Sequence, residues 1–366
     1  MESDILTNND YTSKAISLLQ DLIKIPSFSK EESATADTIA TFLDIHQIAS
    51  QRIGNNIIAY NKYFEDSKPS ILLNSHHDTV KPNSGYTKNP FDASIEEGKL
   101  FGLGSNDAGG CLVSLILTFI HYYSQKLPYN IILVASAEEE ISGKNGIESI
   151  INHLPKIELA IVGEPTLMQM AVAEKGLMVI DAVIRGRAGH AARDEGENAI
   201  YKALEDLDTV KNYQFERKSP FLGNTKVSAT IIQAGSQHNV VPDTCTYTLD
   251  VRVTDSYTLT EALDELNTVL KAELTPRSMR LNSSRVPDGH KILQTANKLN
   301  LIQYGSPTLS DQALIPYPSI KIGPGDSARS HTPDEFIYLE EIHSGIKGYI
   351  NLLNSYIFDE SKSNVI

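Results

Sequence analysis

The chain has 366 residues, of which 41% are hydrophobic and 21% are charged, as is typical of a folded protein. A single hydrophobic core stops growing at roughly 250 to 300 residues, so we expect two domains. The formal net charge of −14, without any block of lysine and arginine, argues against a nucleic-acid partner, and an anionic substrate would need local cations to bind it.

The N-terminal segment, residues 1–10, is polar and acidic and does not have the basic and apolar parts of a signal peptide. No run of 18 apolar residues occurs, which argues against a membrane partner. Cys111 and Cys245 lack the spacing of a zinc knuckle or a redox pair, so we expect both to be buried and reduced. These features predict a cytoplasmic protein.

The first part of the chain predicts two helices followed by a buried sheet. Residues 11–24 carry apolar side chains at helical spacing, and Ser29 with Glu32 forms a capping-box pattern ahead of a second helix. Residues 110–123 predict a buried helix. Short apolar runs, typical of parallel strands that are covered on both faces, predict strands at residues 56–60, 71–73, 131–135, 159–162 and 320–322.

The pattern changes to alternation between residues 176 and 285. Residues at every second position from Met178 to Ile184 are apolar, which predicts half-buried antiparallel strands. Helical patterns at 198–213 and 259–274 interleave with them, in the order strand, helix, two strands, helix, strand. We therefore expect an α/β domain with a central, mostly parallel sheet flanked by helices, formed by residues 1–175 and 286–366, and an inserted α+β sandwich at 176–285.

Polar groups follow the predicted strands of the α/β domain, where ligands bind in sheets of this kind. His76 and Asp78 follow the strand at 71–73. Residues i and i+2 of an extended segment face the same side, so Asp78 can orient His76 as a metal ligand while His77 points away. A His-x-Asp pair on its own is more often just a pair of polar residues at a strand end.

Asp107 lies in a glycine-rich segment, residues 102–110, ahead of the predicted buried helix. The segment lacks the complete Gly-x-Gly-x-x-Gly spacing of a phosphate-binding loop, and its centre is a carboxylate. A metal-bridging carboxylate therefore fits better, with an ordinary helix N-cap as the alternative.

Further acids and a histidine follow the other predicted strands. The run of three glutamates at 138–140 comes after residues 131–135, and because adjacent acids repel one another, it is either a solvated surface run or part of a metal site. Glu164 follows residues 159–162, and His331 follows residues 320–322. Each is compatible with a structural role when taken alone, but an ordered set of histidines and acids after buried strands predicts a metal site.

With these motifs the chain resembles the co-catalytic zinc amidohydrolases, the family that includes acetylornithine deacetylase, succinyl-diaminopimelate desuccinylase, aminoacylase and glutamate carboxypeptidase. The resemblance covers nearly the whole chain, at residues 75–80, 89–91, 102–110, 138–146, 163–166, 189–190, 239–242, 250–252 and 323–331. It implies a zinc-peptidase-like catalytic domain, an inserted lid or dimerisation domain, and a homodimer. It also implies two Zn²⁺ ions, with Co²⁺ or Mn²⁺ able to substitute.

The resemblance assigns the metal ligands to five residues. His76 and Glu164 would hold one ion. Glu140 and His331 would hold the second, and Asp107 would bridge the two.

The resemblance places catalytic roles on Asp78, Glu139 and His190. Two zinc ions roughly 3.5–4 Å apart lower the pKa of a water and polarise the scissile carbonyl, while a base, here Glu139, passes the proton to the leaving amine. Only the resemblance decides which of the three glutamates is base and which is ligand. His190 would stabilise the oxyanion, often from the other subunit of a dimer. Asn239 and Arg252 would bind the substrate carboxylate, unless Arg252 pairs with an acid on its own sheet.

The segments 310–314 and 323–331 look most like acetylornithine deacetylase. Two departures concern the substrate: no lysine follows Asp107, and no arginine follows Asp311, where the family commonly has one. We expect hydrolysis of a small N-acyl amino acid, as in an N-acetylornithine or N-acetylcitrulline deacetylase of arginine biosynthesis. A succinyl-amino-acid desuccinylase or a dipeptidase or carboxypeptidase of the same family is the alternative. A non-catalytic amino-acid-binding homologue has no need of Glu139, and a dehydrogenase would use the glycines near Asp107 to bind a nicotinamide.

Overall fold

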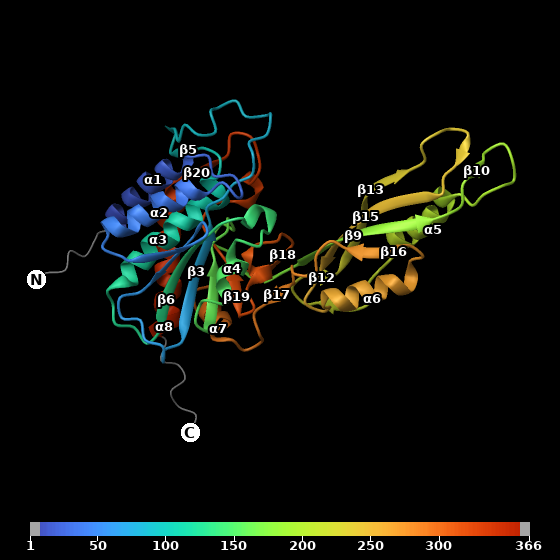
Figure 1. The fold of residues 1–366 in the computed structure, drawn as a ribbon. Helices are drawn as coiled ribbons and strands as arrows, with labels where there is room; N and C mark the ends of the chain where they lie inside the picture. Colours follow the sequence, from blue (N-terminus) through green and yellow to red (C-terminus); the bar gives the residue numbers. More distant parts are fainter. Residues whose placement is uncertain (1–7, 359–366) are drawn as a thin grey trace, which may run out of the picture. The chain divides into compact units, whose positions relative to one another are not determined.

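The structure is a computed structural model that describes residues 8–358 (Figure 1). Residues 1–7, which make up most of the polar N-terminal segment, lie outside the described residues. The described chain forms two compact units. The first unit extends to Val172 and also contains Val286–Tyr304 and the chain from Ser310 onwards, while the second contains Ala173–Arg285 and Gly305–Leu309.

The first unit is built on a mostly parallel sheet in the order β1-β2-β6-β3-β7-β19-β8. β3 is parallel to both β6 and β7, and β19 is parallel to β7, whereas β1, β2 and β8 run antiparallel to their neighbours. The strands are β1 (Ser50–Ile53), β2 (Asn56–Tyr60), β3 (Ser70–His76), β6 (Asn130–Ser136), β7 (Ile157–Val162), β8 (Met170–Glu174) and β19 (Ser319–Lys321). All five strands expected from apolar runs, and the mostly parallel sheet, are confirmed.

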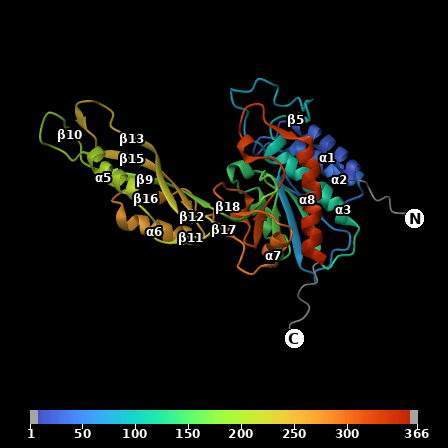
Figure 2. The ribbon, with the colours of Figure 1, turned by 180° about the vertical axis from the view of Figure 1, so that it is seen from behind.

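Both faces of this sheet are covered, which explains why its strands are apolar without alternation. In β3, Ile71 and Leu73 face one core, and Leu72 between them belongs to the core on the other face, where Ile147 and Ile150 of α4 pack. Figure 2 shows α1, α3 and α8 lying together beside the sheet, and α3 contacts both of the others. The helices of this unit are α1 (Asn8–Ile23), α2 (Ser33–Ile45), α3 (Gly110–Tyr123), α4 (Ile147–Ile151), α7 (Lys291–Lys298) and α8 (Leu339–Phe358). The expected helices at 11–24 and 110–123 are confirmed.

The capping box expected at Ser29 and Glu32 is wrong, although the second helix is present. Glu32 is itself the N-cap of α2, and its side chain makes no cap hydrogen bond. The Ser29 hydroxyl instead donates to Asp78 Oδ2 at 2.7 Å, and the buried Glu32 carboxylate accepts the backbone N–H of Glu138 at 3.2 Å. These buried partners compete with the local cap because an unsatisfied buried carboxylate costs more than a lost helix cap.

The second unit contains a four-stranded antiparallel sheet in the order β13-β15-β9-β16. Its strands are β9 (Gly176–Arg185), β13 (Lys226–Ala234), β15 (Thr244–Val253) and β16 (Glu273–Pro276), and its helices are α5 (Ala199–Asn212) and α6 (Leu259–Val269). The alternating apolar residues of β9 are buried against the helices, as expected. The predicted order of strand, helix, two strands, helix and strand is confirmed for these long elements.

The helix expected to reach residue 274 ends earlier. α6 stops at Val269, and β16 then pairs antiparallel with β9, with Leu274 opposite Ala182. The prediction of helix over these last residues is wrong because β9 offers an unpaired edge, with which residues 273–276 pair.

The remaining strands are short. They are β4 (Ile95–Glu96), β5 (Lys99–Phe101), β10 (Gly189–His190), β11 (Lys218–Ser219), β12 (Gly223–Asn224), β14 (Val240–Val241), β17 (Ser284–Arg285), β18 (Gln303–Ser306) and β20 (Phe336–Tyr338). Cys111 and Cys245 are buried and form no disulfide, as expected. Among residues 8–358, no helix combines the length and the apolar character needed to cross a bilayer.

Candidate metal centre

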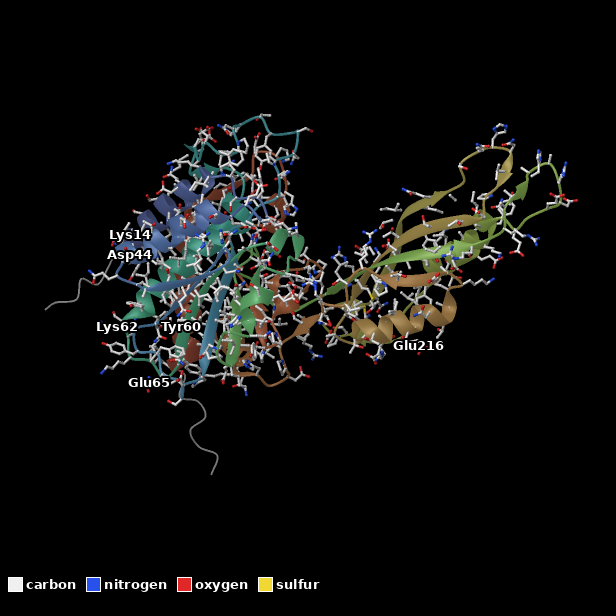
Figure 3. The ribbon with its side chains drawn as sticks, viewed as in Figure 1. Lys14, Asp44, Tyr60, Lys62, Glu65 and Glu216 are labelled. Carbon is white, nitrogen blue, oxygen red and sulfur yellow. The ribbon has the colours of Figure 1, made fainter. Side chains whose placement is uncertain are left out.

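Four of the five predicted ligands come from the carboxyl ends of the parallel strands, and Asp107 lies on the turn before α3. His76 is the last residue of β3, and Glu164 follows β7 after a single glycine. The run 138–140 follows β6, and the segment that carries His331 follows β19. Because these four strands are parallel, their carboxyl ends lie at one edge of the sheet. Glu65, labelled in Figure 3, is hydrogen-bonded to the first residue of β6 and so marks the opposite edge.

His76 lies at the centre of one group of side chains. Its Nε2 atom is 3.3 Å from Asp107 Oδ1, 3.8 Å from Glu139 Oε2 and 3.8 Å from Glu164 Oε1. The His76 side chain is 1% exposed, and each of the three carboxylates is 13% exposed. Four segments far apart in the sequence thus present an imidazole and three carboxylates to the same small volume.

His331 forms the second group. Its Nε2 atom is 3.0 Å from Glu140 Oε2 and 3.7 Å from Asp107 Oδ2. The two oxygens of Asp107 therefore face the two histidines, Oδ1 toward His76 and Oδ2 toward His331. The structure brings the five predicted ligands together, with Glu139 beside them, and Asp107 occupies the position expected of a bridging carboxylate.

Asp78 joins the loops that carry these side chains. Its carboxylate accepts the backbone N–H groups of Glu139 at 3.0 Å and Glu140 at 3.2 Å. The Nδ1 atom of His76 is 3.4 Å from Asp78 Oδ1 but only 2.9 Å from the Asp78 carbonyl oxygen. Sequence reasoning identified Asp78 as the orienting residue but missed that its backbone oxygen is the closer partner.

Two neighbours of the predicted ligands point elsewhere. Glu138 has a left-handed backbone conformation with φ 54°, and its carboxylate accepts two hydrogen bonds from Asn145. The ring of His77 is hydrogen-bonded to Thr35 Oγ1 and to the carbonyl of Asn55, both at 2.9 Å. Of the three consecutive glutamates, therefore, Glu139 and Glu140 face the cluster and Glu138 does not.

The cluster is strongly acidic. Burial lowers the pKa of His76, but the charge of Glu139 and the hydrogen bond with Asp107 outweigh it, so that this pKa lies well above its usual value. The hydrogen bond with Glu140 raises the pKa of His331 to about 9. Burial, opposed by His76 and aided by the charge of Glu164, raises the pKa of Glu139 well above its usual range.

Cations fit this chemistry. Four carboxylates and two imidazoles supply the oxygen and nitrogen donors that zinc binds, and two triads of their ligand atoms each lie within 4.8 Å of one another. Four carboxylate charges held this closely require compensation that two imidazolium ions alone do not supply. The residues present therefore fit a pair of divalent cations.

His190 and Asn239 belong to the second unit, on neighbouring segments. β10, which ends at His190, pairs with β14, and the N–H of Ala191 donates to the Asn239 carbonyl at 3.0 Å. The exposed His190 ring accepts the N–H of Ala192 at Nδ1, at 3.1 Å. A neutral imidazole that accepts at Nδ1 carries its proton on Nε2, so His190 presents a hydrogen-bond donor to its surroundings.

Arg252 also lies in the second unit, on β15. Its guanidinium forms a two-pronged ion pair with Asp250, from Nε to Oδ1 at 2.9 Å and from Nη2 to Oδ2 at 3.1 Å. This arrangement matches the alternative weighed for Arg252, a pair with an acid on its own sheet.

Two buried acids near the cluster had no predicted role. Asp311 accepts Asn74 Nδ2 at 2.8 Å and Ser136 Oγ at 2.6 Å, near the ends of β3 and β6. Glu335 accepts three backbone N–H groups from the turn that carries Asp107, and burial together with the charge of Asp107 raises its pKa to about 8. The only signal for Glu335 in the sequence is an acid shortly after His331, and single acids of this kind are too common to be singled out.

Comparison with known proteins identifies this arrangement. Residues 72–355 match the family described as Peptidase family M20/M25/M40. Acetylornithine deacetylase of Proteus mirabilis (strain HI4320) is 26% identical, with 88% of this chain and 91% of the relative covered. Succinyl-diaminopimelate desuccinylase of Wolbachia pipientis wMel is 23% identical, with 95% and 94% covered.

Solved structures share the fold. Aminopeptidase PepT from Bacillus cereus ATCC 10987 superposes with a TM-score of 0.76 at 16% identity, with 94% of this chain and 98% of that chain covered. The YXEP protein of Bacillus subtilis, described as a dinuclear metal-binding peptidase, superposes with a TM-score of 0.72 at 17% identity, with 96% and 100% covered. The family match over most of the chain agrees with the cluster of donors at the sheet edge, and it rules out the non-catalytic and dehydrogenase alternatives. The chain belongs to peptidase family M20/M25/M40 and is a metal-dependent hydrolase.

Proposed function

We propose that the protein hydrolyses the amide bond of a small N-acyl amino acid, and that its substrate is of the N-acetylornithine or N-acetylcitrulline type used in arginine biosynthesis. The observation that carries the reaction type is the pairing of Asp107 with two histidines, with Glu139 beside them at the same edge of the sheet. The choice of substrate is supported by the likeness to acetylornithine deacetylase over most of both chains.

In this proposal two Zn²⁺ ions would bind at the cluster, and Co²⁺ or Mn²⁺ could replace them. His76 and Glu164 would hold one ion. Glu140 and His331 would hold the second, and Asp107 would be shared between them. When bound, the ions lower the pKa of a water molecule and polarise the scissile carbonyl. The distances of 3.0 to 3.8 Å between the donor atoms support this division of the ligands.

Glu139 is the general base. Its carboxylate lies beside His76, and the hydrogen bond from its backbone N–H to Asp78 holds the main chain in place. It takes the proton of the attacking water and returns it to the leaving amine, a role that needs a carboxylate within reach of the reacting atoms. Asp78 is the positioning residue for His76 and for the loop of Glu139.

The second unit contributes to substrate binding in this proposal, as a lid and dimerisation domain formed by residues 176–285. His190 donates its Nε2–H to the oxyanion, which the hydrogen bond accepted at its Nδ1 atom supports. Asn239, on the segment next to His190, binds the substrate carboxylate. Arg252 would have to exchange its ion pair with Asp250 for the substrate, so of the two predicted carboxylate contacts it has the weaker support.

A panel of substrates tests the proposal. Purified protein with measured metal content would be assayed for kcat/KM on N-acetylornithine, N-acetylcitrulline, their succinyl analogues and dipeptides. We expect the acetyl compounds to be the best substrates. Rapid peptide cleavage without deacylation would instead support the dipeptidase or carboxypeptidase alternative, and a preference for succinyl groups would support the desuccinylase.

The base is tested on the same samples. We expect Glu139→Gln to retain its metal and to lose at least about 10²-fold in kcat, because a general base contributes roughly this much. Glu138→Gln is the matched control, since Glu138 faces Asn145 and is expected to leave kcat within a few-fold of the parent. Near-normal turnover in Glu139→Gln would show that the base is assigned to the wrong residue.

A further inference from the structure

Glu335 is a buried carboxylate that the proposed reaction does not use. It is 2% exposed, and it lies in the segment that follows His331. Its Oε1 atom accepts the backbone N–H groups of Asn106 and Asp107, both at 2.8 Å, and its Oε2 atom accepts the N–H of Gly104 at 3.1 Å. One side chain thus satisfies three main-chain donors of the turn that presents Asp107.

The backbone of Glu335 adds to this connection. Its carbonyl oxygen accepts the N–H of Gly102 at 3.0 Å. Earlier in the same segment, Asp326 exchanges two hydrogen bonds with the Asn106 side chain, at 3.0 and 3.1 Å. The turn at 102–107 and the segment 326–335 are therefore held together at both ends of the segment that contains His331.

The ring of His331 is hydrogen-bonded to Glu140, but much of its side chain faces solvent. Its side chain is 54% exposed, and its backbone has a left-handed conformation with φ 58°. The position of its ring relative to Asp107 therefore depends on how the segment around it is held. Asn83 supports the segment from the other side by donating to the His331 carbonyl at 3.1 Å.

We propose that Glu335 is a positioning residue for the second metal ion, because it fixes the turn of Asp107 against the segment of His331. The proposal rests on the metal centre of the proposed function. Through its hydrogen bonds Glu335 keeps Asp107 Oδ2 and His331 Nε2 at their distance of 3.7 Å, while both of its own oxygens are occupied by main-chain donors. The first ion depends less on Glu335, since His76 and Glu164 come from β3 and the end of β7.

The role requires a carboxylate. Three N–H groups need an acceptor with two oxygens, and both oxygens of Glu335 are used in this way. An amide of the same shape has one acceptor oxygen and directs its NH₂ group at the remaining donors, which leaves a buried N–H without a partner. Glu335→Gln therefore changes the hydrogen bonding of the turn with little change in volume.

The experiment is a titration of the metal-free, full-length protein with Co²⁺, followed by calorimetry and by the visible absorption of the bound ion. We expect the parent to bind two ions per chain. We expect Glu335→Gln to bind the first ion as the parent does, but the second at least about tenfold more weakly and with an altered spectrum, since outer-shell partners of metal ligands contribute on this scale.

Asp206→Asn is the matched control. Asp206 is a 1% exposed carboxylate of the second unit that accepts the backbone N–H groups of Lys271 and Ala272, at 2.9 to 3.0 Å, and the hydroxyl of Tyr247 at 2.8 Å. Its loss lowers stability in the same way, by leaving buried donors unsatisfied, but we expect it to leave both Co²⁺ affinities and the spectrum unchanged. A role of Glu335 in stability alone would make the two variants behave alike.

Glu335→Asp provides a second variant if the glutamine variant does not fold. It keeps a carboxyl group but withdraws it from the turn by one methylene, and we expect selectively weaker binding of the second ion here too. If a folded Glu335 variant binds both ions as the parent does, the inference about Glu335 is wrong, while the proposed metal centre is unaffected. A parent that binds fewer than two ions contradicts the metal centre, and the inference with it.

Discussion

Asp107 faces a different histidine with each of its two carboxylate oxygens. Oδ1 lies 3.3 Å from His76 and Oδ2 lies 3.7 Å from His331. In the proposed metal centre, this division would let one carboxylate contact both cations. Its backbone N–H is bound by Glu335, so the main chain at this point is held by a side chain from the far end of the sequence.

At the residue scale, the buried His77 predicts a pH dependence of stability. Burial lowers its pKa to about 4, and the charges of His76 and Arg52 add to this effect while the Asn55 carbonyl and Asp78 oppose it. Histidine in the unfolded chain titrates near 6.5, so the unfolded state binds more protons between these values. The contribution of His77 to the free energy of unfolding is therefore fully present above about pH 6.5, and it is lost as the pH falls toward 4.

We expect the metal-free protein to lose about 2 kcal/mol of its unfolding free energy through His77 between pH 6.5 and pH 5, on the scale of about 1.4 kcal/mol per pH unit. Urea unfolding in the presence of a chelator, at both pH values, measures the loss. His77→Gln cannot titrate and should show a correspondingly smaller dependence on pH, since the other titrating groups remain. An identical dependence in parent and variant would contradict this account.

At the scale of elements, the parallel strands explain the convergence of the ligands. β3, β6, β7 and β19 end at one edge, and each ends in or is followed by a donor.

Two segments of the chain have the residue pattern of a capping box, but only one of them forms the box. Ser29 and Glu32 form no box because both side chains have buried partners. Thr258 and Glu261 at the exposed start of α6 form the complete box.

The box on α6 provides a prediction about stability. Thr258 Oγ1 accepts the N–H of Glu261 at 3.1 Å, and the Glu261 side chain accepts the N–H of Thr258 at 2.8 Å. We expect Thr258→Ala to lower the free energy of unfolding of the second unit by about 1 kcal/mol, the usual effect of losing such a cap. Urea denaturation measures the change. Thr268→Ala, near the other end of α6, is the control, and an equal loss in both variants would show that the cap contributes nothing specific.

At the scale of the whole molecule, an exposed edge strand supports the predicted homodimer. β13 forms one edge of the four-stranded sheet in the second unit, and its Ile231 and Ile232 are 51% and 52% exposed. An edge strand with exposed apolar side chains is a template for pairing with another chain. Tyr201 and Leu204 of α5 are also exposed, which adds apolar surface in the same unit.

We expect a dimer in sedimentation velocity experiments, and we expect the double substitution of Ile231 and Ile232 by glutamate to shift it to the monomer. Placing a charge on each side of the edge opposes strand pairing, since like charges then meet across the interface. Ile45→Glu, an exposed apolar position of the first unit, is the control and should leave the dimer intact. A monomeric parent, or a doubly substituted variant that remains dimeric, would contradict the assignment of this edge.

The sequence by itself determined the main elements and the neighbourhood of the site. Apolar runs and periodicity predicted the strands β2, β3, β6, β7 and β19 and the buried helix α3, because these patterns reflect burial on one or two faces, which each segment carries locally. Polar residues directly after those strands predicted His76, Glu164 and the run 138–140 as neighbours. The rule that parallel strands end at one edge needs no further information.

Only the tertiary structure decided which atoms meet. Glu138 turns toward Asn145 while Glu139 and Glu140 face the histidines, and three identical side chains in a row carry no signal for this difference. The three hydrogen bonds of Glu335 were equally hidden, because they join segments distant in the sequence. For Arg252 the sequence left two partners open, and the folded chain decided for Asp250, two residues away on the same strand. Polar groups take the partners that the folded chain brings near, and local pattern does not encode that choice.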